Sequence, residues 1–494
     1  MAKLSRRKFI QSSAAASTAF GLFTIAGTKV SGKVLGANDT IRVGVAGING
    51  RGRSHISAFS KELKDKNVQV TYLIDPDARL FDSRKSMVTE GGGNDPKCVQ
   101  DIRQALDDKN LDAVSVATCN HWHSLITVWA CQAGKDVYVE KPISHNVYEG
   151  RKCVEAAQKY GRVVQHGTQQ RSSSERASEI AAVQSGKYGK LLVSKAYCCK
   201  GRWSIGNKPV QVSPAGFDFN LWLGPAPEQA YHGNLVHYNW HWFWDTGNGD
   251  IGNQGVHEID VARWVIKDGT LPKSVWSLGG RFGIDEKAGV AKGIGDQGQT
   301  PNMQMAVFDY GDTLLVFEVR GLVGEGQKLQ NKVSNEFYTT DGVIRSGTFF
   351  RNGSSEGERV VGPEVRVTPG GPFGSFIAAM RSRKPEDANA NAEVAHYSAA
   401  LCHLANISYR LGKKAPFDKA GQSLGDNKLV VETFNNLRDN LKVVGVNLDE
   451  TTYNVGSSLA FDAKTEKFTG AGADAANPML ARAYRHPFVV PQNV

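Results

Sequence analysis

From Thr40 onward, short runs of β-branched and other apolar residues alternate with longer stretches of helical pattern. Strands joined by crossover helices produce this alternation, and continuous apolar runs are typical of strands buried on both faces of a parallel sheet. We predict strands at 41–46, 67–74, 113–117, 136–139 and 163–166, and helices at 123–133 and 148–160. The pattern therefore predicts an N-terminal α/β domain on a parallel sheet.

Beyond about residue 170 the apolar stretches follow one another with breaks typical of hairpins, one of them at Tyr310–Asp312. We predict strands at 191–198, 274–279, 303–310 and 313–320, and a helix at 393–411. The second domain is therefore predicted to rest on a largely antiparallel sheet. We interpret the glycine- and serine-rich segments 283–300 and 346–371 as surface loops, and the chain from residue 450 as an irregular wrapping extension.

The first 37 residues carry six Lys or Arg and no acidic residue, and they include Arg6 and Arg7. An apolar stretch at 14–26 follows, shorter than the ~20 residues of a membrane-spanning helix. This arrangement is typical of a twin-arginine export signal. We expect the export machinery to carry a folded protein to the periplasm and the signal to be removed near Leu35–Ala37. No cysteine lies near that point, so no stable membrane anchor is expected.

We therefore divide the chain into an export signal at 1–37, a first domain at 38–168, a second domain at 169–412 and a C-terminal extension at 413–494. The net charge of +10 falls to about +4 without the six signal charges, which leave 53 basic against 49 acidic residues. A nucleic-acid partner is therefore not expected. The seven cysteines show no C-x-x-C spacing, which argues against a disulfide framework.

Residues 41–52 form a predicted strand, a glycine turn and the start of a helix. Such a turn binds a dinucleotide pyrophosphate, because glycine lets the backbone approach the phosphates and helix N–H groups face them. Gly47 and Gly52 occupy the outer positions of G-x-G-x-x-G, and Asn49 replaces the middle glycine. Asp75 ends the next strand, 23 residues after Gly52, where an acid commonly binds the adenosine ribose. We expect NAD rather than NADP, whose 2′-phosphate Asp75 would repel; the alternative is an ordinary β-α turn.

Three further blocks lie at 118–123, 140–142 and 249–260. With the glycine turn they resemble the family of glucose-fructose oxidoreductase, inositol dehydrogenase and MocA, over roughly residues 40–412. The resemblance implies an α/β protein in which an N-terminal Rossmann domain is joined to a C-terminal α/β domain with an open, largely antiparallel sheet. The face of that sheet closes over nicotinamide and a sugar. Because the sheet is often an interface in this family, we also expect a homo-oligomer.

The resemblance assigns roles to individual residues. Lys141 matches the family's catalytic lysine, His257 its catalytic histidine and His123 a position near the cofactor. The family commonly has an aspartate where this chain has Asn253, which cannot carry a proton. We expect Asn253 to orient His257 or a sugar hydroxyl. The cofactor set is Gly47, Asn49, Gly50, Arg51, Gly52, Asp75, Asn120, His123, Glu140 and Lys141.

The chemistry of a sugar alcohol requires the same groups. Its hydroxyl proton must leave while hydride passes from the same carbon to nicotinamide. His257 suits the base, because the unperturbed pKa of histidine is about 6.5. Lys141, after a parallel strand, suits the stabilisation of a developing alkoxide. The alternatives are a solvated lysine at a strand end and a core histidine.

Aromatic side chains crowd the segment 231–244, where they alternate with histidines. Aromatic faces pack on sugar rings, so this segment is a candidate substrate wall, with core or interface packing as the alternative. His237 and His241 have the spacing of a zinc pair but lack the glutamate of a metalloprotease, so we assign no metal. The substrate set is Gln170, Arg171, Trp240, His241 and Trp242.

Three functions remain open from the sequence. The first is a periplasmic oxidoreductase that uses tightly held NAD on a secondary hydroxyl of a sugar or glycoside; tight retention is expected because the cofactor must be loaded before export. The second is an NAD-dependent glycosidase that works by transient oxidation and elimination. The third is a non-catalytic sugar-binding protein, since a fold does not fix an activity.

Overall fold

The first domain is built on a six-stranded sheet in which neighbouring strands pair in parallel. The computed structural model describes residues 39–284, 295–324, 332–417 and 424–494, so the signal predicted at 1–37 lies outside the described residues. The strand order, β3-β2-β1-β4-β5-β6, is that of a Rossmann fold. The strands are β1 Ile41–Ala46, β2 Val68–Ile74, β3 Lys97–Val99, β4 Ala113–Val116, β5 Asp136–Val139 and β6 Val164–His166.

Helices cover both faces of this sheet, because its strands are apolar on both sides. Along β5, for example, Val137 and Val139 join one core cluster and Tyr138 joins the other. The helices are α2 Gly52–Ser57, α3 Phe81–Gly92, α4 Ile102–Leu106, α5 Asn120–Gln132 and α6 Val147–Lys159. The five predicted strands and two predicted helices of this domain are confirmed to within three residues, and β3 is an addition.

The second domain contains a 12-stranded sheet in which the neighbouring strands are antiparallel except for the parallel pair β7 and β10. The predicted, largely antiparallel sheet is therefore confirmed. The strands are β7 Leu191–Cys199, β8 Ser274–Gly280, β9 Met303–Asp309, β10 Leu314–Arg320, β11 Lys332–Thr339, β12 Gly342–Arg345, β13 Thr348–Arg351, β14 Gly357–Arg359, β15 Lys413–Pro416, β16 Thr452–Val455, β17 Leu459–Asp462 and β18 Lys467–Thr469.

Helices pack on the two faces of this sheet. Ala306 and Phe308 of β9 face a core shared with α10 and α12, whereas Met303 and Met305 face α13. The remaining helices of the chain, not all of which contact this sheet, are α7 Ser174–Gln184, α8 Phe219–Leu223, α9 Gly249–Asn253, α10 Gly255–Trp264, α11 Gly371–Ser382, α12 Ala392–Arg410, α13 Lys428–Val443 and α14 Ala473–Ala476.

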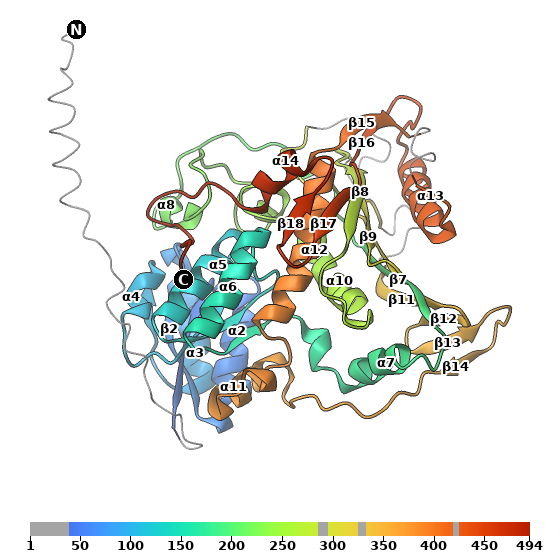
Figure 1. Ribbon diagram of the computed structural model, residues 1–494. Helices are drawn as coiled ribbons and strands as arrows, with labels where there is room; N and C mark the ends of the chain where they lie inside the picture. Colours follow the sequence, from blue (N-terminus) through green and yellow to red (C-terminus); the bar gives the residue numbers. More distant parts are fainter. Residues whose placement is uncertain (1–38, 285–294, 325–331, 418–423) are drawn as a thin grey trace, which may run out of the picture.

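The chain returns twice to the first domain after it has built the second sheet. Phe376 and Met380 of α11 are fully buried in a core cluster with β1 and β2. Phe488 and Val490, near the C-terminus, join the other core of the first domain. Figure 1 shows α11 and the C-terminus both lying beside that domain. Each fully buried side chain of this kind contributes about 1.5–3 kcal/mol, so both late segments stabilise the first domain.

Two predictions for the C-terminal half are wrong. The segment 346–371 was predicted to be a loop, but it contains β13 and β14. The chain from residue 450 was predicted to be irregular, but it forms β16, β17, β18 and α14. These strands have three or four residues each and are only partly buried or fully exposed, so they present no apolar run that would mark them as strands. Part of the predicted loop 283–300 lies outside the described residues.

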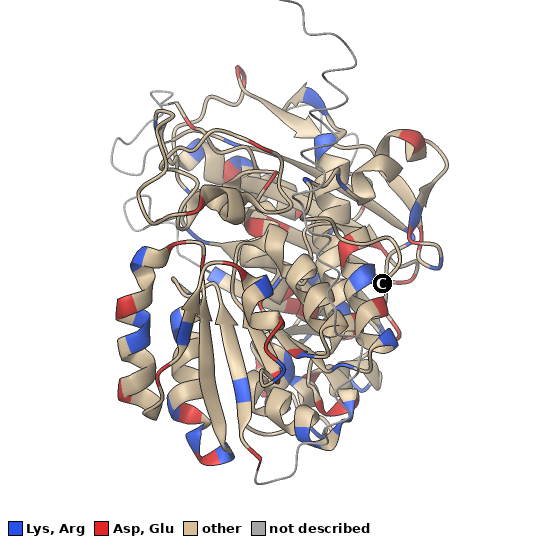
Figure 2. Cartoon of the chain, turned by 90° about the vertical axis from the view of Figure 1, so that its left-hand side faces the viewer, with Lys and Arg blue, Asp and Glu red and all other residues tan. Residues whose placement is uncertain are grey.

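The described surface carries charges of both signs. Figure 2 shows Lys and Arg interspersed with Asp and Glu along the same helices. All seven cysteines are free thiols. No helix in the described ranges combines the length and apolar character needed to cross a bilayer.

Candidate active site

A cavity of about 500 Å³ lies at the carboxyl edge of the first sheet, where segments of the second domain cover it. It is the position at which open α/β sheets bind ligands. Most of the residues chosen from the sequence line this single cavity: Gly47, Asn49, Gly50, Arg51, Asp75, Asn120, His123, Glu140, Lys141, Trp240, His241, Asn253 and His257.

The glycine turn between β1 and α2 leaves room for a ligand beside its backbone. Gly47 has φ +77°, and a Cβ there would lie 2.6 Å from the backbone of Ala117. A Cβ on Gly52 would lie 1.8 Å from the oxygen of Gly47, so Gly52 serves the close packing of the turn rather than the lining. At Gly50, which lines the cavity, a Cβ would meet open space. Asn49 fits in place of the middle glycine because its side chain accepts a hydrogen bond from Arg84.

Asp75 lies at the carboxyl end of β2, with one oxygen bound by the N–H of Ile48 and the other by the N–H of Asp77, each at 2.9 Å. Burial raises the pKa of Asp75 to about 6, against the effect of these two hydrogen bonds. Each carboxylate oxygen can accept a further hydrogen bond. The geometry of the turn and the position of Asp75 therefore fit the pyrophosphate and ribose of a dinucleotide.

Glu140 ties the glycine turn to the end of β5. Its Oε1 accepts from Arg51 Nε at 2.8 Å and lies 3.1 Å from His55 Nε2. Although Glu140 is buried, His55 and Arg51 hold the pKa of its carboxyl well below the usual range. A carboxylate here neutralises Arg51 at the edge of the cavity.

Lys141 follows β5, and its peptide bond to Pro142 is cis. Its Nζ donates to the backbone oxygen of Asn253 at 2.7 Å and to Asn253 Oδ1 at 3.2 Å. Burial lowers the pKa of Lys141, while Glu140 and Asp250 act in the opposite direction. The Asn253 side chain contacts Lys141 and Asp250 rather than His257. That it orients a sugar hydroxyl stays a prediction.

His257 lies in the first turn of α10 and lines the same cavity as Lys141. Burial lowers the pKa of His257 to about 3, and the charge of Lys141 acts in the same direction. The imidazole is therefore neutral near pH 7, but with a pKa of about 3 it is a much weaker base than a free imidazole with a pKa of about 6.5. The two domains thus bring an amine and a proton acceptor to one cavity.

The nicotinamide end of the predicted site contains buried polar groups at the start of α5. His123 is held between the carbonyl groups of Pro142 and Thr118, at 2.7 and 3.0 Å. Asn120 donates to the side chain of Asn248 at 3.2 Å. Both contacts fix the carboxyl edge of the first sheet, and the second joins it to the second domain.

The aromatic segment contributes part of the cavity wall. His241 stacks on Trp240 with ring centroids 3.5 Å apart, and Tyr238 lies beside them in the lining. Trp242 does not line the cavity; its ring lies 5.3 Å from the guanidinium of Arg202. His237 contacts Asp77 at 3.1 Å. Among the described residues, no group of three or more His, Cys, Asp and Glu is arranged to hold a metal ion.

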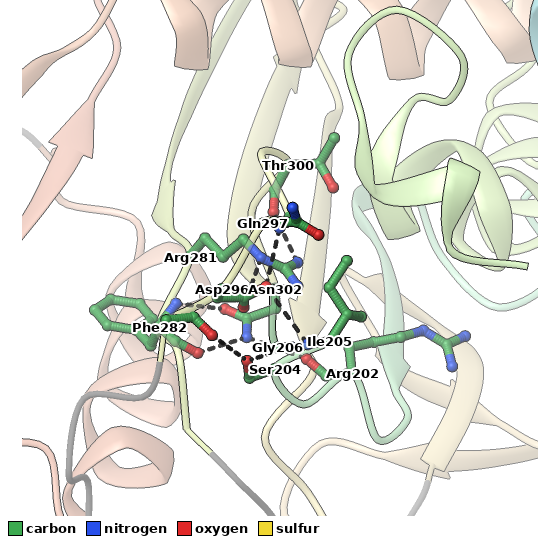
Figure 3. Close-up of polar contacts among 12 residues, drawn as sticks. Arg202, Ser204, Ile205, Gly206, Arg281, Phe282, Asp296, Gln297, Thr300 and Asn302 are labelled. Atoms are coloured by element: carbon green, nitrogen blue, oxygen red, sulfur yellow. Dashed lines mark hydrogen bonds and ion pairs between the residues drawn. The ribbon is translucent and has the colours of Figure 1, made fainter. Parts of the chain in front are cut away.

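A network of polar contacts holds this wall in place. The N–H groups of Gln299 and Thr300 both donate to the backbone oxygen of Trp242. Arg281 forms an ion pair with Asp296 at 2.9 Å, with side chains 9% and 7% exposed. Figure 3 shows the contact between Arg281 and Asp296 beside further contacts that join the segment after β7 to the segment 296–302, among them Gln297 to Gly206 and Asn302 to Arg202.

The structure does not bring Gln170 and Arg171 to the candidate site. Gln170 is exposed and lines a second, polar cavity of about 1480 Å³. Arg171 is buried in an ion pair with Asp260 at 2.9 Å. Gln169, one residue earlier, lines the first cavity. The three residues share a 3₁₀ turn, in which successive side chains point about 120° apart.

Sequence reasoning also missed Trp222 and Tyr238, which both line the cavity. Tyr238 lies within the aromatic run, which was a sufficient signal to include it. Trp222 lies in α8, and no local pattern distinguishes it from a core tryptophan.

Comparison with known proteins agrees with this geometry. Residues 41–168 match a model described as the oxidoreductase family with NAD-binding Rossmann fold, and residues 186–279 match that family's C-terminal alpha/beta domain. A glycosyl hydrolase family 109 protein of Shewanella pealeana is 26% identical over 41% of this chain and 48% of that protein. An inositol 2-dehydrogenase of Leifsonia xyli subsp. xyli is 30% identical over 31% of this chain and 43% of that protein. The chain thus spans about half the length of the curated relatives it matches.

Two solved structures share the fold. WlbA dehydrogenase from Bordetella pertussis, in complex with NADH and UDP-GlcNAcA, matches with a TM-score of 0.53 and 16% identity over 75% of this chain and 97% of that one. A levoglucosan dehydrogenase in complex with NADH and levoglucosan matches with a TM-score of 0.52 and 17% identity over 74% of this chain and 96% of that one.

The Rossmann sheet, its glycine turn and the cavity at its carboxyl edge are those of a dinucleotide-binding oxidoreductase. Residues 41–168 match the NAD-binding Rossmann domain of the family of glucose-fructose oxidoreductase, inositol dehydrogenase and MocA, and residues 186–279 match its C-terminal domain.

Proposed function

We propose that the protein oxidises a secondary hydroxyl of a sugar or glycoside with tightly bound NAD. The observation that carries this proposal is the meeting of Lys141 and His257, from different domains, in the cavity that contains the glycine turn. Related proteins named inositol 2-dehydrogenase and 1,5-anhydro-D-fructose reductase support a polyhydroxylated substrate.

Each residue has a defined task in this proposal. Gly50, where a Cβ would meet open space, leaves room for the pyrophosphate, and Gly47 lets the turn pack against the backbone of Ala117. The Asp75 carboxylate accepts the ribose hydroxyls, which favours NAD over NADP. Bound NAD supplies the hydride acceptor. His257, neutral near pH 7, removes the hydroxyl proton, and Lys141 donates a hydrogen bond to the oxygen as negative charge develops on it.

Retention of the cofactor has a structural argument of its own. Leu221, Trp222, His237 and Tyr238 of the second domain line the same cavity as Asp75 and thereby cover the adenosine end. A cofactor enclosed in this way is re-reduced and re-oxidised in place, so a second sugar is a suitable hydride acceptor. We include in the proposal export by the twin-arginine route, a periplasmic location and a homo-oligomer, for which the sequence pattern and the family resemblance are the support.

The second candidate is a glycosidase in which transient oxidation acidifies a neighbouring C–H bond, the leaving group is eliminated and the product is re-reduced. The relative named glycosyl hydrolase family 109 protein favours it. This candidate predicts aglycone release from a synthetic glycoside without net NADH, together with deuterium exchange at C2. The first candidate predicts an oxidised sugar, no release of aglycone and no deuterium exchange at C2.

The first test is mass spectrometry of the small molecules that denatured, purified protein releases, followed by assays with a panel of sugars and glycosides. NAD in the released fraction and turnover of a sugar support the proposal. A protein without bound nicotinamide that is inert towards sugars and added NAD contradicts it. Lys141→Ala should lower kcat at least about 100-fold, since it removes a donor to the developing alkoxide. Sugar binding without turnover in the wild-type protein would instead support the non-catalytic alternative.

A further inference from the structure

The hydrogen bonds of Lys141 leave one donor for a ligand. A lysine ammonium has three N–H donors, and Asn253 accepts two of them through its backbone oxygen and its Oδ1. The third N–H is the one that remains for an oxygen in the cavity. Its direction depends on how firmly Asn253 holds the other two.

Asp250 determines which end of the Asn253 amide faces Lys141. The two ends of an amide differ only in their hydrogen atoms, so a fixed acceptor on one side sets the orientation. Asp250 Oδ1 accepts from Asn253 Nδ2 at 3.2 Å, which turns Oδ1 of Asn253 towards the lysine. Asp250 itself is 1% exposed.

Arg202 and Cys198 hold Asp250 in turn. Arg202 Nε donates to Asp250 Oδ1 at 2.8 Å, and Cys198 Sγ donates to Oδ2 at 3.2 Å. The backbone oxygen of Arg202 accepts from Asn302 Nδ2 at 3.1 Å. Figure 3 shows the Arg202 side chain extending away from these backbone contacts. The contacts that lead from Arg202 through Asp250 and Asn253 to Lys141 therefore start from a residue whose backbone is held in place.

We propose that Asp250 is a positioning residue that acts through the Asn253 amide to fix the direction of the Lys141 ammonium group. This inference rests on the proposed function in one respect, namely that Lys141 takes part in the oxidation of a sugar. The negative charge of Asp250 does not contact Lys141 directly, because the neutral amide of Asn253 lies between them. Lys141 is thus held in direction without a direct ion pair that would compete with a substrate oxygen.

The charge of Asp250 also acts on the protonation of Lys141. Burial lowers the pKa of Lys141, and Asp250 is among the carboxylates that oppose this effect. Loss of the Asp250 charge should therefore lower the pKa further. A carboxylate moved to position 253 would lie directly against Nζ and should raise it.

The test compares Asp250→Asn, the exchange variant Asp250→Asn/Asn253→Asp and the control Asp260→Asn. Asp260 is also a buried carboxylate paired with an arginine, but its partners are Arg171 and Ser398. Acetylation of the Lys141 amine is followed against pH by peptide mass spectrometry, with no sugar or NAD added. The kcat for sugar and the Kd for NAD are measured in parallel.

We expect Asp250→Asn to lower kcat by about 10–100-fold, as loss of a group that orients a reacting residue does, and to lower the midpoint of Lys141 acetylation without changing the Kd for NAD. The exchange variant should raise the midpoint above that of the wild type but should not recover kcat, because its direct ion pair with Lys141 competes with the substrate oxygen. It also tests the inference where Asp250→Asn does not fold. Unchanged midpoints in both variants, or an equal shift in Asp260→Asn, would overturn it. If the wild-type protein turns over no sugar, the proposed function fails, and the acetylation midpoints still decide the role of Asp250.

Discussion

Burial drives two charged residues of the cavity towards their neutral forms. It lowers the pKa of Lys141 and raises the pKa of Asp75 to about 6. Neighbouring groups oppose burial in both cases: the carboxylates of Glu140 and Asp250 at the lysine, and two backbone N–H groups at the aspartate. Asp75 therefore changes its charge within the range in which enzymes are commonly assayed.

The affinity for NAD should fall as the pH drops through about 6, because the pKa of Asp75 is raised to about 6. Above that pH the carboxylate accepts the ribose hydroxyls, and below it the neutral acid accepts them less well. A Kd about tenfold weaker at pH 5 than at pH 8 is expected if only the ionised form binds. Titration of cofactor-free protein with NAD measures it. Asp75→Asn should bind more weakly and show a flat profile; the same pH dependence in that variant would assign the titration to another group.

The residues that could be predicted are those whose role is encoded locally. Gly47, Asp75, Lys141 and His257 stand at fixed places relative to a strand end or a helix start, and they all line the cavity. The contact between Lys141 and Asn253 could not be predicted, because it joins residues 112 positions apart. The assignment of Gln170 and Arg171 failed because a 3₁₀ turn changes side-chain direction at each residue.

At the scale of elements, the segment 216–237 of the second domain contacts residues 76–78 of the first domain, beside Asp75. The N–H of Ala78 donates to the oxygen of Gly216, and the N–H of Asp218 donates to the oxygen of Pro76, each at 2.9 Å. His237 adds a contact to Asp77. The segment therefore closes the cavity through backbone pairing that a side-chain substitution leaves intact.

His237→Ala should speed the loss of bound NAD about 3–10-fold, since it removes one partly exposed hydrogen bond to a charged group, worth about 1 kcal/mol after solvent screening. The release of NAD into an excess of a cofactor scavenger gives the rate. His232→Ala is the matched control, because His232 lies in the same segment and packs on Phe243 rather than on Asp77. Equal rates in the two variants would show that His237 has no part in retention.

Buried strands could be predicted, and exposed edge strands could not. The strands β1, β2, β4 and β5 are rich in apolar residues and largely buried, which the sequence displays directly. By contrast, β14 is exposed at each of its three positions, so no burial pattern marks it. It forms because β13 offers it a partner, and a partner is information that a local pattern does not contain.

At the scale of the whole molecule, the last residues hold the first domain and the cavity wall together. Arg482 donates to the backbone oxygen of Asp245 at 3.0 Å, and Arg485 Nε donates to that of Gly224 at 3.1 Å. Phe488 packs against Trp122 with ring centroids 5.4 Å apart. Residue 413 therefore marks no boundary in space, because the C-terminal residues complete a core cluster that begins at Ala46.

Phe488→Ala should destabilise the protein by about 3 kcal/mol, because Phe488 is 2% exposed and its loss leaves a cavity in the core of the first domain. Phe488→Leu keeps most of the volume and should cost less than about 1.5 kcal/mol. Urea unfolding followed by tryptophan fluorescence measures both, since Trp122 reports on this contact. Because Trp122 also lines the candidate site, Phe488→Ala should weaken the binding of NAD as well. An unfolding midpoint equal to that of the wild type would mean that the C-terminal segment lies on the domain without stabilising it.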